Sequence, residues 1–310
     1  MFARSEGRWA SRWPLRSGER CARADERAWA LALVHCSREW DRQVERSRDQ
    51  HERVFKDNGR PDPWDGLTSS FVPAPDDAPD NPVISYLRSV LRADSVLLDV
   101  GAGAGRLSVP ASRLCKTVLA VEPSPAMAAE LKLQRDRRGI DNIDIRTVRW
   151  EEDDPAPVDV VLMSHVLYGV VPITPFVEKA MAIAGDAVIA VLGQSPPGGY
   201  YHPLWPAVHG VERIVAPGAR YFEKLLIGRG QVPEMIHLPE IRAVNFRDRD
   251  EAIARSARRL RVKVGTPAHD RLEHAVDSAL VDSEDGTCHF RWRKPTASLL
   301  FRWPADTGLR

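Results

Sequence analysis

The sequence predicts an α/β fold built around a mostly parallel β-sheet. Short apolar runs, typical of buried strands, alternate with helical segments from about residue 83 to residue 195. The first run, Val96–Val100, leads directly into a loop with glycines at positions 101, 103 and 105. The second run, Thr117–Val121, ends at the carboxylate of Glu122. Strands that alternate with helices imply right-handed crossovers and a three-layer domain.

The glycine loop has the chemistry of a ligand cradle. Glycine lacks a Cβ, so it accepts positive φ and lets a ligand approach the backbone. A helix that begins after the loop adds unpaired N–H groups and a partial positive charge, which suit an anionic or carboxylate-bearing cofactor. The dinucleotide fingerprint G-x-G-x-x-G does not fit, because the third glycine, Gly105, comes one residue early. A nicotinamide-dependent oxidoreductase is therefore disfavoured, although it stays open as an alternative.

Glu122 has the position of a ribose-binding residue. It follows Asp99 by roughly 20 residues, at the end of the second predicted strand. A carboxylate there can accept hydrogen bonds from both hydroxyls of a nucleoside ribose. The alternative interpretation is a solvated carboxylate at a strand end.

The segment from Asp99 to Gly105 resembles the first motif of class I S-adenosylmethionine (SAM)-dependent methyltransferases. The resemblance covers residues 83–195 well and the remainder in outline. It implies a Rossmann-like fold with a mostly parallel seven-stranded sheet, an antiparallel final strand and helices on both faces. It also implies SAM as the cofactor, bound by Asp99, Gly101, Ala102, Gly103, Gly105, Glu122 and Pro123.

The segment after the third predicted strand, Ile143–Val148, contains Trp150 and several acids. The same resemblance implies that Trp150 packs beside the adenine. A following carboxylate, Glu151 or Glu152, would accept the adenine amino group. A tryptophan at a strand end is otherwise usually a core residue.

The exit of the fourth predicted strand, Val158–Ser164, is the expected place for catalysis. In an open parallel sheet, ligands bind beyond the carboxyl ends of the strands, where the strand order reverses. Ser164 is expected beside the cofactor, and His165 and Tyr168 face the methyl-transfer position. His165 would act as a general base, with an acid-side limb near its usual pKa of about 6.5, or orient the acceptor. A purely structural histidine is the third possibility.

The chain beyond the fifth predicted strand, Asp186–Leu192, is irregular and rich in aromatic residues. The side chains expected to line the acceptor pocket, unless they pack as core, are Tyr200, Tyr201, His202 and Trp205. An insertion over about residues 196–285 is assigned to a helical cap. Strands at Cys288–Arg293 and Ser298–Trp303, joined by residues 294–296, would complete the domain.

The chain divides into three parts on composition. We expect residues 1–20 to be a loosely ordered basic terminus. The alternative is that they contact RNA or a membrane surface. Residues 21–82 predict extra N-terminal helices and an acidic, proline-rich linker. Trp64 and Phe71 would anchor this linker over the active-site mouth or pin a surface loop. The resemblance implies that residues 83–310 form the SAM-binding domain.

Composition excludes several other classes of function. The 310 residues carry a formal net charge of +1, which does not favour nucleic acid or an anionic membrane as partner. The four cysteines are scattered, so we expect neither a metal site nor disulfides. The same cysteine usage predicts a cytoplasmic protein. No apolar run approaches the ~18–20 residues of a membrane span.

We therefore expect a methyltransferase that acts on an unidentified small molecule. The Asn/Asp-Pro-Pro-aromatic signature of amino-methylating nucleic-acid enzymes is missing after the fourth strand, where Ser164–Leu167 stands. The alternative from another class is a module that binds SAM or S-adenosylhomocysteine without turnover. The sequence leaves the oligomeric state open.

Overall fold

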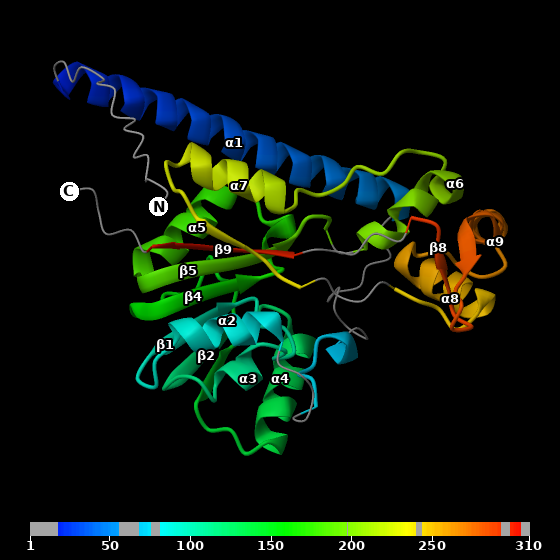
Figure 1. Cartoon of the computed structure of the whole chain (residues 1–310), viewed down its shortest axis with the longest axis horizontal. Coiled ribbons are helices and arrows are strands. Elements are labelled where there is room, and N and C mark those ends of the chain that lie inside the picture. Colours follow the sequence, from blue (N-terminus) through cyan, green and yellow to red (C-terminus); the bar gives the residue numbers. More distant parts are fainter. Residues whose placement is uncertain are drawn as a thin grey trace, which may run out of the picture.

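The computed structural model describes residues 18–55, 68–75, 81–196, 198–239, 244–292 and 298–304. In these residues the main body is a seven-stranded sheet of order β3-β2-β1-β4-β5-β9-β6 (Figure 1). The strands are β1 Val96–Val100, β2 Thr117–Val121, β3 Ile143–Arg146, β4 Val158–Ser164, β5 Ala184–Gly193, β6 Glu234–His237 and β9 Ser298–Pro304. Strands β1 to β5 pair in parallel, whereas β9 runs antiparallel between β5 and β6. The predicted class I fold, including its antiparallel final strand, is confirmed.

The strand order reverses between β1 and β4. From β1 the chain moves outward through β2 to β3, and then returns to β4 on the other side of β1. The carboxyl ends of these two central strands therefore flank the point at which α/β sheets bind ligands. Both strands are almost wholly buried, which explains their near-continuous apolar sequences.

Helices cover both faces of the sheet (Figure 1). One face is covered by α1 Gly18–Phe55, α5 Ile173–Ile183 and α7 Ala219–Gly228, and the other by α2 Pro82–Val90, α3 Ser108–Ala111 and α4 Pro125–Arg137. Trp40 of α1 packs edge-on against Phe222 of α7, and Phe222 contacts Phe301 of β9 in the same way. The core therefore extends through three layers.

The long helix α1 is an integral part of this domain. Trp40 donates from Nε1 to the carbonyl of Val170 at 3.1 Å. Asp41 accepts from the backbone N–H of Ile173 at 3.0 Å, at the start of α5, where the N-cap residue Pro172 has no polar side chain. The structure has one continuous helix where the sequence predicted extra N-terminal helices, and this helix positions the segment after β4.

A separate cap is built from two stretches of chain. It consists of the 3-10 helix η3 Gly199–Leu204 with α6 Trp205–His209, and of α8 Arg249–Arg259, α9 Pro267–Ala279 and the hairpin β7 Leu280–Asp282 with β8 Cys288–Phe290. These elements enclose their own apolar core around Phe246 and Phe290. In contrast to the predicted continuous insertion over about residues 196–285, α7 and β6 belong to the main domain.

The last two predicted strands lie in different sheets. The first of them, β8, pairs with β7 inside the cap. The final strand β9 pairs with β5 and β6. The physical reason is burial: Cys288 and Phe290 pack into the cap core, and Leu300 and Phe301 pack into the main sheet.

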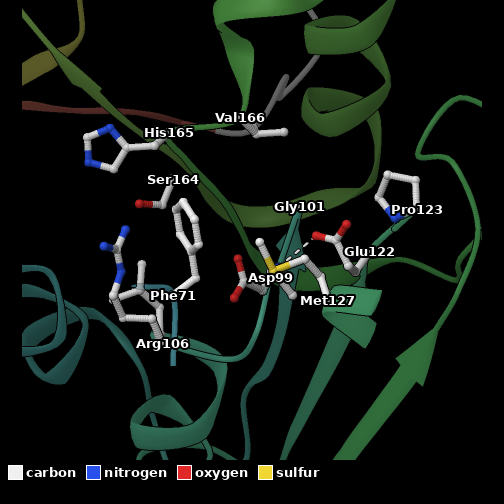
Figure 2. Close-up of a pocket in the computed structure, with 13 residues that line it drawn as sticks. Phe71, Asp99, Gly101, Arg106, Glu122, Pro123, Met127, Ser164, His165 and Val166 are labelled. Carbon is white, nitrogen blue, oxygen red and sulfur yellow. Dashed lines mark hydrogen bonds between the residues drawn. The ribbon is translucent and has the colours of Figure 1, made fainter. Parts of the chain in front are cut away.

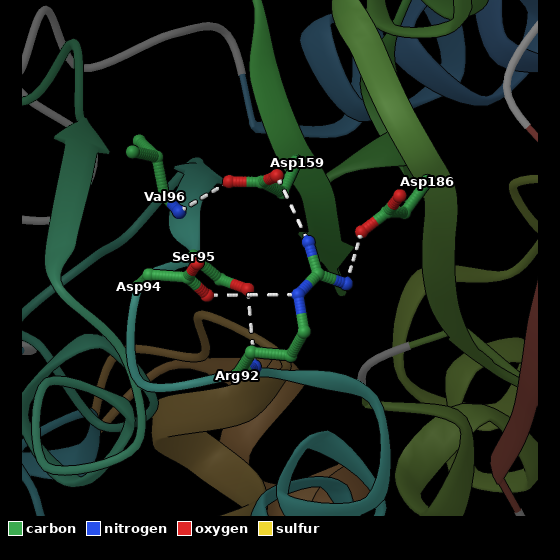
Figure 3. Close-up of polar contacts among 6 residues, drawn as sticks. All are labelled: Arg92, Asp94, Ser95, Val96, Asp159 and Asp186. Carbon is green, nitrogen blue, oxygen red and sulfur yellow. Dashed lines mark hydrogen bonds and ion pairs between the residues drawn. The ribbon is translucent and has the colours of Figure 1, made fainter.

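Arg92 ties together the amino-terminal edge of the sheet, opposite the ligand-binding edge (Figure 3). Its guanidinium donates to Asp186 at 2.8 Å and to Asp159 at 3.2 Å. Asp159 also accepts from the backbone N–H of Val96 at 2.7 Å. Because Arg92 is exposed, each pair contributes little by itself, but together they join β1, β4 and β5.

Some predicted features lie outside the described residues. These are most of the basic terminus, Trp64 and the greater part of the acidic linker. Within the ranges given above, no helix has the length and apolar character needed to span a bilayer.

Candidate active site

A cavity of about 260 Å³ opens at the carboxyl ends of β1, β2 and β4 (Figure 2). It brings together eight of the predicted site residues: Asp99, Gly101, Ala102, Gly103, Glu122, Pro123, Ser164 and His165. Phe71, from the predicted linker, also lines it. The cavity therefore lies where the reversal of strand order predicts a ligand site.

The three glycines of the loop have different tasks. All three have left-handed backbones, with φ of 72°, 57° and 88° at Gly101, Gly103 and Gly105. A Cβ on Gly105 would lie 2.3 Å from Leu131, and one on Gly101 would lie 2.7 Å from Val166, but one on Gly103 would meet nothing within 4 Å. Gly105 is therefore a packing residue, which explains why it does not line the cavity. Gly103 is the position at which open space adjoins the backbone.

The helix after the loop is short. It spans only Ser108–Ala111, so its dipole contributes little to the cavity. The Gly101 and Ala102 amides are themselves occupied, because both donate to the carbonyl of Val121. The loop is thus fastened to the end of β2.

Glu122 fastens the same loop from the other side. Its carboxylate accepts from the backbone N–H of Gly103 at 2.7 Å through one oxygen and from that of Ser124 at 2.8 Å through the other. The side chain is only 5% exposed. Each carboxylate oxygen can accept more than one hydrogen bond, so the pair can also serve a vicinal diol in the cavity.

Asp99 is a buried carboxyl group at the end of β1. Ser108 donates from its hydroxyl to Asp99 at 2.6 Å. Burial raises the pKa of Asp99 to about 6, a shift that the Ser108 hydrogen bond opposes. At neutral pH the group remains mostly a carboxylate, and it faces the cavity.

His165 and Tyr168 form a hydrogen-bonded pair beyond β4. His165 has φ of 59°, and its backbone N–H donates to the carbonyl of Val191 on β5. The Tyr168 hydroxyl accepts from the backbone N–H of Gly193 at 2.7 Å and lies 2.9 Å from Nδ1 of His165. The hydroxyl proton satisfies both groups when it is directed at Nδ1, which leaves the histidine proton on Nε2. Tyr168 itself does not line the cavity.

Burial sets the charge state of this pair. It lowers the pKa of His165 to about 4, with a smaller contribution from the positive charge of Arg106. It raises the pKa of Tyr168 to about 12, opposed by the hydrogen bond from Gly193. Both side chains are therefore neutral at pH 7. A neutral imidazole with Nδ1 occupied presents a hydrogen-bond donor to its surroundings.

A second chamber of about 280 Å³ adjoins the first on the side of Trp150. The two share Gly101, Pro123 and Val166 as walls. Trp150 is 2% exposed and donates from Nε1 to the carbonyl of Phe176 at 3.1 Å. Glu151 also lines this chamber, and it is an exposed residue that pairs with Arg149 at 3.1 Å. The predicted adenine-side residues thus lie next to the main cavity.

The four aromatic residues predicted for the acceptor pocket lie in the cap. Tyr200 accepts from the backbone N–H of Phe290 and donates to the carbonyl of Val244, while Trp205 contacts the ring of Phe55. Tyr201 belongs to the same core. Burial lowers the pKa of His202 to about 4, with help from Arg213. None of the four is among the described residues that line the cavity.

Sequence reasoning missed four lining residues: Arg106, Leu107, Met127 and Val166. Arg106 follows the third glycine and resembles an ordinary surface residue at a helix start. In the structure its guanidinium lies with Ser164 and His165 on one side of the cavity, and Glu122 and Pro123 lie on the other (Figure 2). Among the described side chains, no three His, Cys, Asp or Glu residues gather as a metal site.

Comparisons with known proteins agree with this geometry. Residues 98–186 match the family model described as a methyltransferase domain. The ubiquinone biosynthesis O-methyltransferases of Rhodopseudomonas palustris and Bradyrhizobium diazoefficiens are 35% and 39% identical to this chain over 103 residues. These matches span 32% of this chain and 40% of the relatives.

Solved structures show the same fold. The YcgJ protein from Bacillus subtilis is 10% identical, with a TM-score of 0.50 over 73% of this chain and 98% of that one. A Bacillus halodurans protein assigned to the methyltransferases is 15% identical, with a TM-score of 0.50 over 73% of this chain and 99% of that one. Residues 98–186 therefore match a methyltransferase domain, and the chain has the fold of the class I methyltransferases.

Proposed function

We propose that this protein is a SAM-dependent methyltransferase that methylates a small organic molecule. The observation that carries the proposal is the position of the Glu122 carboxylate. It lines the cavity at the end of β2 and accepts from the backbone N–H of Gly103 at 2.7 Å. A nucleoside ribose bound there would meet the two carboxylate oxygens of Glu122. The rest of the cofactor would then extend along the glycine loop.

The other charges of the cavity fit the amino-acid end of the same cofactor. Asp99 is a buried carboxylate that suits an ammonium group, and Ser164 supplies a hydroxyl on the same wall. The adenine would enter the chamber beside Trp150, whose buried ring forms an apolar wall. Glu151 is the candidate acceptor for the adenine amino group, because it lines that chamber from its exposed side.

The bound cofactor would supply a methyl group on a positively charged sulfur that leaves as a neutral thioether. The protein's contribution would then be mainly orientation and exclusion of water. His165 would orient the acceptor through its Nε2–H. Its low pKa and its occupied Nδ1 make it a poor general base near pH 7.

Two observations support a small acceptor. The chain has almost no net charge, so no broad positive field would attract a nucleic acid. The curated relatives that it matches are named for O-methylation in ubiquinone biosynthesis.

The test is transfer of a radiolabelled methyl group. Purified protein would be incubated with methyl-labelled SAM and the small-molecule fraction of a bacterial extract. We expect label in an organic product, and none with the Gly103→Val variant. Binding of SAM without transfer in any extract would favour the non-catalytic module. Binding of NAD in place of SAM would overturn the proposal.

A further inference from the structure

The helix α1 forms part of the chamber beside Trp150. Arg48 of α1 lines this chamber, together with residues 169–171, which lead from the exit of β4 toward α5. The family model matches residues 98–186, so α1 lies outside the matched domain. The walls of this chamber therefore come partly from an element outside that domain.

One face of α1 also holds the chain that forms and follows this wall. Trp40 donates from Nε1 to the carbonyl of Val170 at 3.1 Å. Asp41, the next residue of α1, accepts from the backbone N–H of Ile173 at 3.0 Å. The two contacts are adjacent on α1 and three residues apart on the loop, so together they fix both the position and the direction of the loop.

The loop has few other means of keeping this position. In the described part of the chain, no other hydrogen bond reaches the Val170 carbonyl or the Ile173 amide. Pro172, the N-cap residue of α5, has no polar side chain, so the first amide of α5 depends on Asp41 for an acceptor. The Asp41 carboxylate also lies near the positive end of the α5 dipole. The contacts from α1 are therefore the main polar restraint on residues 170–173.

The start of α5 in turn sets an apolar wall of the chamber. One turn earlier on α1, the hydroxyl of Ser37 lies 2.7 Å from the hydroxyl of Thr174. Phe176 follows in α5 and lines the chamber, and its carbonyl accepts from Nε1 of Trp150 at 3.1 Å. The rings of Phe176 and Trp150 pack edge to face. A displacement of the start of α5 would therefore move the wall on which the nucleobase is expected to lie.

We infer that α1 completes the chamber for the nucleoside end of the cofactor, with Trp40 and Asp41 as positioning residues for its loop wall. The inference rests on the proposed function. Neither side chain is among the described residues that line the two cavities, so both would act through the position of residues 169–171. Ordering a loop during binding costs affinity, so a wall that is fixed beforehand favours the ligand.

The experiment removes one restraint and measures the nucleoside end separately. Asp41→Ala removes the acceptor of the Ile173 amide, whereas Asp41→Asn keeps an oxygen acceptor. Each variant is titrated by calorimetry, well below its unfolding temperature, with S-adenosylhomocysteine and with 5′-methylthioadenosine, which has the nucleoside but lacks the amino acid. Gln43→Met is the matched control, because Gln43 lies on the same helix and donates at 2.6 Å to the carbonyl of Val215, which lines neither cavity. Hydrogen exchange of residues 166–176 reports on the loop itself.

We expect Asp41→Ala to weaken both ligands by about tenfold, the scale of a hydrogen bond to a charged group. The two factors should be equal, because both ligands carry the nucleoside. Exchange of the Ile173 amide should become faster, and S-adenosylhomocysteine should slow it again. Asp41→Asn should recover most of the affinity. Gln43→Met should lower stability and leave both affinities unchanged, whereas a merely structural Asp41 would behave in the same way as this control.

Trp40→Phe is a second variant, which removes the donor to Val170 and keeps an aromatic ring against Phe222. It should weaken both ligands as Asp41→Ala does, and it provides the test if Asp41→Ala does not fold. The inference is overturned if the folded variants bind both ligands normally, if Gln43→Met weakens them to the same extent, or if only S-adenosylhomocysteine is affected. Failure of the wild type to bind S-adenosylhomocysteine would instead overturn the proposed function.

Discussion

The Tyr168 hydroxyl bridges the end of β5 and the imidazole of His165. It accepts from the backbone N–H of Gly193 at 2.7 Å and lies 2.9 Å from Nδ1 of His165, and we assign its proton to the hydrogen bond with Nδ1. The pair links the exit of β4 to the end of β5, where the methyl acceptor is expected. It also determines how the site responds to pH and to substitution.

The first prediction concerns pH. The pKa of His165 is about 4 in the folded protein and about 6.5 in the unfolded chain, so between these values the unfolded chain binds a proton that the folded protein does not. Stability is therefore lost as the pH falls from about 6.5 toward 4. By pH 5 the loss from this group is about 2 kcal/mol.

Urea unfolding of wild type and His165→Gln at pH 7 and pH 5 measures this loss. We expect the wild type to lose more stability than the variant between the two pH values. An equal loss in both proteins would contradict the buried neutral histidine. From the sequence alone, the rate of turnover was expected to fall below about pH 6.5 if His165 is a general base. Because the pKa of His165 is lowered to about 4, that fall is now expected nearer pH 4.

The second prediction removes the link between the two residues. Tyr168→Phe leaves the Gly193 N–H without its acceptor and releases Nδ1 of His165, so unfolding should become easier by about 1–3 kcal/mol. Nitrogen-15 NMR should show the histidine proton redistributed between Nδ1 and Nε2. Tyr86→Phe, which removes an exposed hydroxyl contact with Glu234, is the matched control and should cost less than about 1 kcal/mol. An unchanged tautomer in Tyr168→Phe would refute the role assigned to the hydroxyl.

The third prediction separates an effect on ligand binding at Gly103 from the effect on stability that a similar substitution has elsewhere. Gly103→Ala and Gly139→Ala both place a Cβ on a left-handed residue with open space around it. Each should therefore cost about 1–2 kcal/mol of backbone strain. Only Gly103→Ala should also abolish binding of S-adenosylhomocysteine, because Gly139 lies in the turn after α4, away from the cavity. Calorimetry that finds equal affinity in the two variants would show that the loop is misassigned.

The fourth prediction concerns Glu122. Glu122→Ala should weaken S-adenosylhomocysteine by ~2–4 kcal/mol through loss of two charge-assisted hydrogen bonds. The sequence alone suggested that folding would change little. The structure predicts an additional loss of about 1–3 kcal/mol in stability, because the Gly103 and Ser124 amides lose their acceptor. Asp141→Asn, an exposed carboxylate before β3, should change neither quantity in the same titration and urea experiments.

The main sheet could be predicted because its strands carry their own signal. Buried parallel strands such as Val158–Ser164 need apolar residues on both faces, so their sequences are distinctive without any tertiary information. The glycine loop and Glu122 could be located for a similar reason, since both follow directly from the ends of such strands. Their place in the cavity follows from the fold.

The cap could not be predicted in the same way. Tyr200, Tyr201 and Trp205 are the residue types expected in a substrate pocket and equally in a core. Segments distant in sequence cover them, namely the end of α1 at Phe55 and the chain from Phe246 to Phe290. The partner of β8 likewise depends on long-range packing. Arg106 was overlooked because its environment is created by β4 and the segment around Phe71, which the sequence does not place beside it.

The central claim is that the cavity between the glycine loop and Glu122 binds SAM. Calorimetric titration of the wild-type protein with S-adenosylhomocysteine and, separately, with NAD tests it most directly. We predict saturable binding of S-adenosylhomocysteine at one site per chain, and no binding of NAD. Absence of binding by S-adenosylhomocysteine, or saturable binding of NAD, would contradict the account.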